Sequence, residues 1–334
     1  MLRRRQSRTV AAVLVFGAVL TAGTGPHALA QVSLTEGYRL VDTWTTRDPG
    51  GDVVRLHQPV SVDAAPDDSL FVVDQQGSTV YHLDSGARVL AQWVTDTSIG
   101  SPAHVSASGD RVYVTGVNAG EVRTYDGRLL RLLDLPGVSG VDVGPDGRVY
   151  VPRHTGFALA GETVIDILNA AGDVVSTWVD DPFTVLAPRG VSVAPDGRVF
   201  LAADGVVYVW RNGAIQTGLR APTTLEGTDI VDVSVDTDDR VFAVQVASTR
   251  RILVWTASSG AWREHLDLPG AQSLDAGPGT GLVAAIQLFG GFTGLSLLAD
   301  RGDLAGAWEH LGETDETLGK LDGPRRLATS PGGD

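Results

Sequence analysis

The 334-residue sequence contains no cysteine, which excludes a disulfide framework and a lipid-anchored N-terminal cysteine. A secreted domain without disulfides must take its stability from packing and backbone pairing. Lysine is almost absent as well, because Lys320 is the only one and arginine takes its place. We interpret this preference as genomic composition, without functional weight.

Basic residues are outnumbered: 26 Lys and Arg stand against 40 Asp and Glu, for a net charge of −14. Without the first thirty residues, which hold four arginines and no acid, the net charge is about −18. A charge of this sign argues against nucleic acid or anionic lipid as a partner. A net negative charge of this size is typical of exported proteins, because it keeps them soluble.

Several patterns of catalytic and helical proteins are also missing. The chain has no helical periodicity of useful length, no Gly-x-Ser-x-Gly nucleophile, no phosphate loop and no zinc-protease helix. The sequence therefore favours an all-β fold without a matched catalytic constellation.

The N-terminus has the three parts of a secretory signal. A basic start is followed by an uncharged apolar stretch from Thr9 to Gly25 and by small residues at Ala28 and Ala30. The basic residues are Arg3, Arg4, Arg5 and Arg8. We predict that residues 1–30 are a signal peptide, and that the mature protein is secreted or extracytoplasmic and free of the membrane. An uncleaved anchor is the alternative, although the apolar stretch is shorter than the ~20 residues of a membrane span.

One short pattern recurs along the chain. The stretch "PDGRVYV", Pro145 to Val151, returns as "PDGRVFL", Pro195 to Leu201. Proline presets φ for a type I turn, and glycine follows where φ must be positive. Asp68 and Asp239 occupy the glycine position in two other copies, at a strain of ~1 kcal/mol that aspartate tolerates better than most residues.

The turn belongs to a longer repeat of four short strands. Its anchor is the apolar residue four positions before the turn proline, and the anchors recur with a period near forty residues. They are Val62, Val105, Val141, Val191, Val233, Leu274 and Leu327. Four antiparallel strands repeated at this period predict a β-propeller of about six four-stranded blades, with a seventh unit incomplete.

The two ends raise the question of how the ring closes. The stretch from Tyr38 resembles a fourth strand, whereas "PRRLATSPGGD" from Pro324 begins a new unit and then stops. Either the end strands complete a six-bladed ring, or the chain is part of a longer reading frame. The predicted division is 1–30 signal peptide, 31–55 N-terminal segment with a closing strand, and 56–334 propeller.

Two stretches resemble a known family. "PRGVSVAPDGRVFLAAD", from Pro188, and "QPVSVDAAPDDSLFVVDQQGSTVYHLD", from Gln58, are similar to NHL repeats, within the group of six-bladed TolB-like propellers. The resemblance implies a secreted bacterial propeller whose ligand site is the mouth of the central channel, where the loops after the second and fourth strands meet. The protein is also similar in size to streptogramin-lyase-type propellers, but lacks their strand motifs. Repeats of this kind occur in proteins of unrelated function.

The mouth supplies the candidate ligand residues. Unit three has the longest loop, "RHTGFALAGE", and unit six carries "LFGGFTG" on the opposite side of a six-bladed ring. A cation and an imidazole that face aromatic rings could bind an anionic or aromatic ligand. The alternative is a loop that packs on its own apolar residues and binds nothing. The candidates are Arg153, His154, Phe289, Phe292, Gln58 and Asp74.

Related propellers also include metal enzymes. Similar lactonases hold a divalent ion with Glu, Asn and Asp, and similar amidating lyases bind zinc through histidine. The histidines nearest the mouth are His57, His104 and His154. We predict no cofactor and no catalytic residue, and a monomeric, non-catalytic propeller that binds a protein, peptide or glycan. The alternative is a metal-dependent hydrolase or lyase at the channel mouth.

Overall fold

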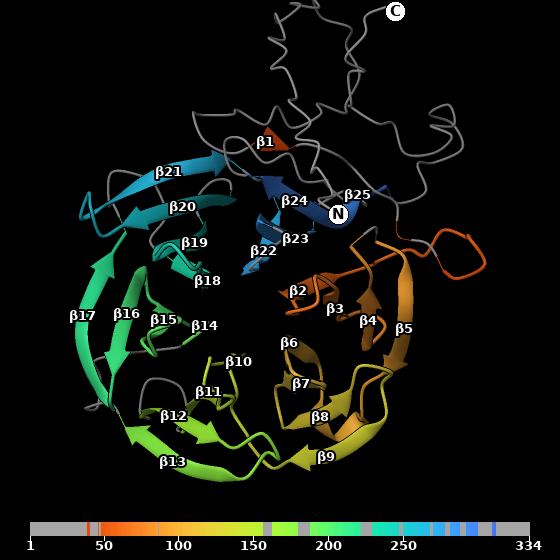
Figure 1. Ribbon diagram of the computed structural model, residues 1–334, viewed down its shortest axis with the longest axis horizontal. Coiled ribbons are helices and arrows are strands. Elements are labelled where there is room, and N and C mark those ends of the chain that lie inside the picture. The colour runs from red at the N-terminus through yellow and green to blue at the C-terminus, as the bar shows by residue number, and fades with distance from the viewer. Residues whose placement is uncertain are drawn as a thin grey trace, which may run out of the picture.

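A computed structural model shows that the chain forms an all-β propeller, with sheets arranged in a ring around a central axis (Figure 1). The structure describes residues 39–40, 46, 48–85, 87–155, 162–179, 188–221, 229–246, 250–267, 270–277, 281–287, 292–299 and 309–311. The predicted signal peptide and the final unit from Pro324 lie outside the described residues.

Five sheets are the expected four-stranded meanders, so the described residues form five such blades where about six were predicted, and we number them 1 to 5 along the chain. Blade 1 contains β2 (Pro59–Ala64), β3 (Leu70–Asp74), β4 (Thr79–Leu83) and β5 (Val89–Val94). Blade 2 contains β6 (Pro102–Ser108), β7 (Arg111–Gly116), β8 (Gly120–Thr124) and β9 (Leu129–Leu133). Blade 3 contains β10 (Asp142–Val143), β11 (Val149–His154), β12 (Thr163–Leu168) and β13 (Val174–Val179).

The remaining complete blades follow the same order, with the first strand of each nearest the central axis and the fourth at the rim (Figure 1). Blade 4 contains β14 (Gly190–Val193), β15 (Val199–Ala203), β16 (Val206–Arg211) and β17 (Ala214–Arg220). Blade 5 contains β18 (Asp229–Val235), β19 (Arg240–Val246), β20 (Arg250–Thr256) and β21 (Ala261–Asp267).

The last sheet departs from the predicted four-stranded pattern, and we call it the closing sheet. It contains β22 (Ala271–Gly277), β23 (Gly281–Gln287), β24 (Phe292–Ala299), β1 (Arg39–Leu40) and β25 (Glu309–Leu311). Strand β1 pairs with one end of β24, and β25 pairs with the other end. The fourth-strand position is thus shared by two short strands, one from each side of the repeat array.

The turns between first and second strands have the predicted backbone. Gly147 and Gly197 have φ values of 73° and 81°, and Asp68 and Asp239 adopt φ values of 65° and 64°. The two aspartates therefore occupy the left-handed region that favours glycine. The turn geometry inferred from the repeat is confirmed at these four positions.

Hydrophobic clusters fill the spaces between neighbouring blades. In β3, Leu70 and Val72 contact the cluster shared with the closing sheet, whereas Phe71 and Val73 belong to the cluster shared with blade 2. All four side chains are buried because each face of a blade is covered by its neighbour. Burial on both faces explains why the second strands read as continuous apolar runs.

Short loops join the strands, and helical structure is sparse in the part of the chain that the structure describes. It consists of one 3₁₀ turn, Thr97–Ile99, before blade 2. Within the described ranges, no helix has the length and apolar character needed to cross a membrane.

Candidate functional site

The channel is lined by the residues on either side of the apolar anchor of each unit, most of which are polar and two of which are glycines. The residues before the anchors are Ser61, His104, Gly140, Gly190, Asp232 and Ser273, and those after them are Asp63, Ser106, Asp142, Ser192, Ser234 and Asp275. Eight of them line a small polar cavity at the centre of the ring, which therefore contains four carboxyl groups and one imidazole in its wall: Ser61, Asp63, His104, Asp142, Ser192, Asp232, Ser273 and Asp275. We call these twelve residues the channel rings.

Most polar residues of the channel rings accept hydrogen bonds from the backbone of the next blade. Asp63 Oδ2 accepts from Ala107 N at 2.9 Å, and Asp142 Oδ2 accepts from Val193 N at 2.6 Å. Ser192 Oγ accepts from Val235 N at 3.1 Å. These bonds fix the angle between neighbouring first strands, because a backbone N–H at a blade edge would otherwise be unsatisfied.

The same contacts cross the junction between the closing sheet and blade 1. Asp275 Oδ2 accepts from Ala64 N of blade 1 at 2.9 Å, whereas Asp275 Oδ1 accepts from Ser234 Oγ of blade 5, on the other side, at 3.1 Å. Ser273 Oγ accepts from Val62 N at 3.5 Å. The side chain of Asp275 thus joins β22 of the closing sheet to β2 of blade 1.

Burial changes the acidity of the channel carboxyl groups. It raises the pKa of Asp142 to about 7, with a further contribution from the charge of Asp275, and raises the pKa of Asp232 to about 7. The pKa of Asp63 is raised well above its ordinary value by burial and by the charges of Asp275 and Asp142. Near neutral pH Asp142 and Asp232 are therefore partly protonated, and the channel offers both hydrogen-bond donors and acceptors.

His104 contributes a neutral imidazole to the same cavity. Burial lowers its pKa to about 4, so the ring stays uncharged at neutral pH. It is the only titratable base that lines the cavity among the described residues. A neutral imidazole next to carboxyl groups can accept or relay a proton, and it can also serve as a polar wall.

At blade 1, the predicted ligand residues hold the loop in front of β2. Asp74 is 1% exposed, and its two oxygens accept from His57 N at 2.6 Å and from Gln58 N at 2.9 Å. The side chain of Gln58 donates to Gln75 Oε1 at 3.0 Å. His57 is half exposed, with Nδ1 3.7 Å from Asp74 Oδ2. Asp74 therefore has a clear role in positioning backbone.

At blade 3, the guanidinium of Arg153 forms a largely buried ion pair. Its Nε and Nη2 lie 2.6 Å from Asp166 Oδ2, and Nη1 donates to Pro136 O at 3.3 Å. Asp166 also accepts from Thr177 Oγ1 at 2.7 Å. Three guanidinium nitrogens of Arg153 are therefore already bonded to Asp166 and to the backbone. His154 is the last residue of β11 and donates its backbone N–H to Gly137 O at 3.1 Å.

The aromatic candidates of the closing sheet are less fully described. Phe289 lies outside the described residues, and Phe292 begins β24, where its backbone pairs with Leu311. Blade 3 and the closing sheet do lie across the ring from each other (Figure 1). The structure does not bring Gln58 and Asp74 together with Arg153 and His154, since the two pairs belong to blades 1 and 3.

The three histidines proposed as zinc ligands occupy different environments. His57 lies beside Asp74, His104 lines the channel, and His154 ends β11. Within the described ranges, which include all three, no three histidine or acidic side chains are grouped so that they could hold a metal ion. Among the described residues, the three histidines are therefore not brought together.

Two features of this region were not predicted from the sequence. One is the set of channel carboxyl groups, which an alternation of Ser or Asp around each anchor, as in "SVDA", "GVDV" and "SLDA", could have revealed. The other is a charged cluster on the mouth face, in which Arg189 Nη2 lies 3.0 Å from Asp229 Oδ2. Asp204 is in the same cluster, since burial and the charge of Asp229 raise its pKa. Arg250 interacts with both members of the ion pair, and burial lowers its pKa.

Comparisons with known proteins show the fold. No protein family and no curated protein matches the sequence. A virginiamycin B lyase from Staphylococcus aureus aligns with a TM-score of 0.55 at 14% identity, over 79% of this chain and 88% of that one. A gluconolactonase from Xanthomonas campestris gives 0.53 and 16%, over 83% and 94%. The PQQ-bound aldose sugar dehydrogenase from Streptomyces coelicolor gives 0.53 and 13%, over 81% and 99%. The chain is thus similar to β-propellers that differ in chemistry.

Proposed function

We propose that this protein is a secreted, non-catalytic propeller that binds a protein, peptide or glycan at its mouth face. The observation that carries the proposal is the contrast between two parts of that face. At blades 1 and 3, the polar residues hold loops and strands in place. At blades 4 and 5, the ion pair between Arg189 and Asp229 is exposed, with guanidinium and carboxyl side chains 50% and 35% accessible. Exposed charge on a rigid scaffold is what recognition needs.

The test uses purified residues 31–334 on glycan and peptide arrays. We expect a defined ligand class to bind, and binding to fall at least tenfold when Arg189 and Asp229 are both changed to alanine. The matched control is Arg211→Ala, which removes an exposed arginine from the opposite face. Equal loss in both variants, or unchanged binding without the ion pair, contradicts the proposal.

The alternative is a metal-dependent hydrolase or lyase with its site at the channel mouth. The observation that favours it is the neutral His104 beside the carboxyl groups of the cavity. Two proteins of similar fold are named as a lyase and as a gluconolactonase. Metal analysis of the purified protein separates the two proposals. Stoichiometric metal that is lost in His104→Ala supports the enzyme, whereas no metal and no change of Tm on chelation supports the binding protein.

We also propose that the chain belongs with NHL-type, TolB-like propellers and closes with six units. Support comes from the anchor pattern and from the Asp275 contact, which joins the closing sheet to blade 1. A chain shortened after residue 311 should then melt cooperatively at nearly the same temperature. A large loss of stability would instead favour a ring that needs the unit beginning at Pro324.

A further inference from the structure

The rim of the ring contains a recurring closure between neighbouring blades. In this closure, the fourth strand of one blade presents a large apolar residue, and a glycine in the turn before the fourth strand of the next blade covers it. Three junctions have this arrangement, between Trp93 and Gly127, Leu133 and Gly172, and Trp178 and Gly213. A Cβ placed on these glycines would lie 2.8, 2.5 and 3.3 Å from Trp93 Cε3, Leu133 Cδ2 and Trp178 Cδ1. The apolar residue and the glycine are thus in direct contact.

The junction between blades 4 and 5 is different. By strand register Leu219 occupies the position of Trp178, since Val207 pairs with Leu219 as Ile165 pairs with Trp178. The covering glycine is Gly260, and no atom lies within 4 Å of a Cβ placed there. The turn between Thr256 and Ala261 has four residues, whereas the turns that contain Gly127, Gly172 and Gly213 have three, three and two, and Gly260 N donates to Thr256 O.

The consequence is an open groove at this junction. On one side it is lined by Gly218, Leu219 and Arg220 of β17 and on the other by Gly260, Trp255 and Trp262. We call it the rim groove. The equivalent space is filled by an indole of the chain itself at the junctions where Trp93 and Trp178 stand.

The walls of the rim groove suit an aromatic ring. Trp255 and Trp262 are directly opposite each other on β20 and β21, and both are partly exposed while packing on the core between blades 4 and 5. Gly218 and Gly260 leave backbone without side chains beside them. Aromatic pairs in such a setting are stabilised by more than the burial of their area. Arg220 is exposed at the edge of the groove.

We propose that the rim groove binds a tryptophan side chain of an acidic peptide or protein partner. The indole takes the place that Trp93 and Trp178 fill at their own junctions, between Leu219 and the Trp255–Trp262 pair. Carboxylates next to the bound tryptophan face Arg220, whose planar guanidinium recognises them in a bidentate manner. The rim groove is separate from the mouth face, so this inference does not depend on the proposed function.

The test titrates the protein, labelled with ¹⁵N at its tryptophan indoles, with an acetylated and amidated Asp-Trp-Asp tripeptide. Trp255→Phe and Trp262→Phe variants assign the two relevant signals. We expect saturable shifts of the Trp255 and Trp262 signals. Leu219→Trp should weaken binding at least tenfold, because the chain's own indole then fills the groove as it does in blades 1 and 3. Gln216→Trp, on the same strand but outside the groove, should bind like the unchanged protein.

The Leu219→Trp variant should melt at or above the temperature of the unchanged protein. If it does not fold, Arg220→Glu decides, since it should weaken the acidic tripeptide at least threefold and leave N-acetyl-tryptophanamide unchanged. Three results overturn the proposal: no saturable shift, equal binding by Leu219→Trp, or shifts produced by methyl β-glucoside and not by the tripeptide. The last result would identify a sugar site.

Discussion

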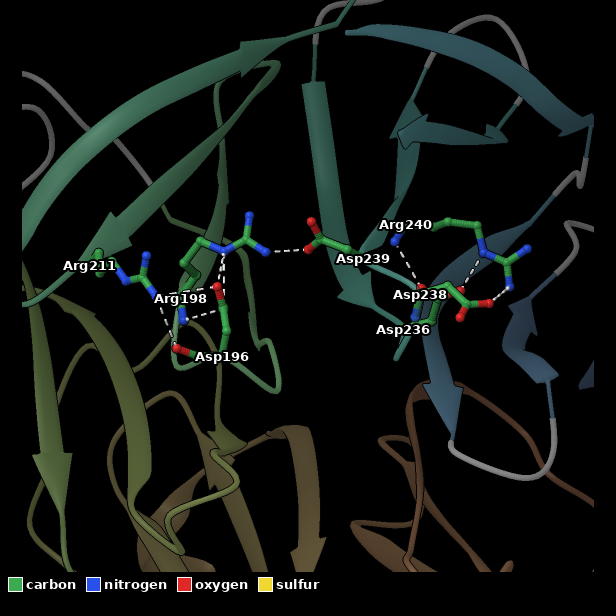
Figure 2. A network of polar contacts seen from close by, with 7 residues as sticks. All are labelled: Asp196, Arg198, Arg211, Asp236, Asp238, Asp239 and Arg240. Carbon is green, nitrogen blue, oxygen red and sulfur yellow. Dashed lines mark hydrogen bonds and ion pairs between the residues drawn. The ribbon is translucent and has the colours of Figure 1, made fainter. Parts of the chain in front are cut away.

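Arg198 of blade 4 donates through Nη2 to the carboxylate of Asp239 in blade 5, and Asp239 holds this contact with a backbone φ of 64° (Figure 2). The guanidinium also lies 2.8 Å from Asp196 Oδ2 of its own turn, and it stacks over Phe200 at 5.3 Å. Asp239 thus occupies a position where glycine would be free of strain. The interblade ion pair is a physical reason for aspartate there.

Replacing the strained aspartate by glycine should therefore have different effects in two blades. Asp68 has nearly the same φ, 65°. Asp68→Gly should raise the free energy of unfolding by about 0.5–1 kcal/mol, because it removes left-handed strain. Asp239→Gly should change it by less than about 0.5 kcal/mol, because the loss of a partly exposed ion pair offsets the relief. Urea unfolding measures both.

A double-mutant cycle with Arg198→Ala isolates the ion pair. The coupling between Asp239→Gly and Arg198→Ala should be a few tenths of a kcal/mol or more, and that between Asp68→Gly and Arg198→Ala should be near zero. Equal stabilisation by the two glycine variants would show that the ion pair contributes nothing.

The turns show how far local sequence predicts this fold. A Pro-Asp-Gly turn is a local signal, because proline and glycine constrain φ within four residues. Its repetition along the chain predicted the propeller architecture. The pairing of Arg198 with Asp239 is not local, since it depends on how two blades are set against each other. The closing sheet combines both cases: β1 comes from the stretch that resembles a fourth strand, whereas the pairing of β25 with the other end of β24 was not expected from the sequence.

The channel carboxyl groups predict an unusual dependence of stability on pH. Asp142 and Asp232 have folded-state pKa values of about 7, above the ordinary value of 3.8. Between these values the folded state binds more protons than the unfolded state, so stability decreases as pH rises. We expect Tm to increase from pH 8 to pH 5 by several degrees. Differential scanning calorimetry in buffers of matched ionic strength measures this change.

Asp142→Asn is the corresponding control, because the amide oxygen can still accept from Val193 N while the group no longer titrates. The increase in Tm from pH 8 to pH 5 should be smaller in this variant. At lower pH, the opposite trend should begin, because carboxylates with lowered pKa values, such as Asp173 beside Arg131, lose their stabilising charge on protonation. A Tm that rises steadily from pH 5 to pH 8 would contradict the assignment.

The ion pair of Arg153 predicts a structural phenotype. Arg153→Ala leaves the carboxylate of Asp166, 3% exposed, with Thr177 as its side-chain partner. Breaking such a pair by removing one partner costs about 3–5 kcal/mol. Arg148→Ala is the matched control, since its pair with Asp146 is exposed and 3.5 Å apart, and it should cost less than about 0.5 kcal/mol. Chemical unfolding compares the two, and similar small costs would leave Arg153 available for a ligand.

This ion pair also shows why the candidate site was harder to predict than the fold. An arginine after a second strand suggests a ligand at the mouth, and the sequence does not reveal that Asp166, thirteen residues later, lies beside it in the paired strand. The same holds for Asp74, whose oxygens bind the backbone of residues 57 and 58. Residue type predicted polarity at the mouth, and only the strand register shows which polar groups are already paired.

The closure of the ring can be tested at Asp275, which accepts from Ala64 N of blade 1. Asp275→Ala leaves this backbone N–H without its acceptor, at a cost of about 1–3 kcal/mol, whereas Asp275→Asn keeps an oxygen in place and should cost less. Asp232→Ala is the matched control, because Asp232 Oδ2 accepts from Leu274 N at 2.9 Å between blade 5 and the closing sheet. If the ring is closed, both alanine variants should lose similar stability, and the Ala64 amide should exchange faster with deuterium in Asp275→Ala alone. If Asp275→Ala leaves stability unchanged while Asp232→Ala lowers it, the junction between the closing sheet and blade 1 opens in solution.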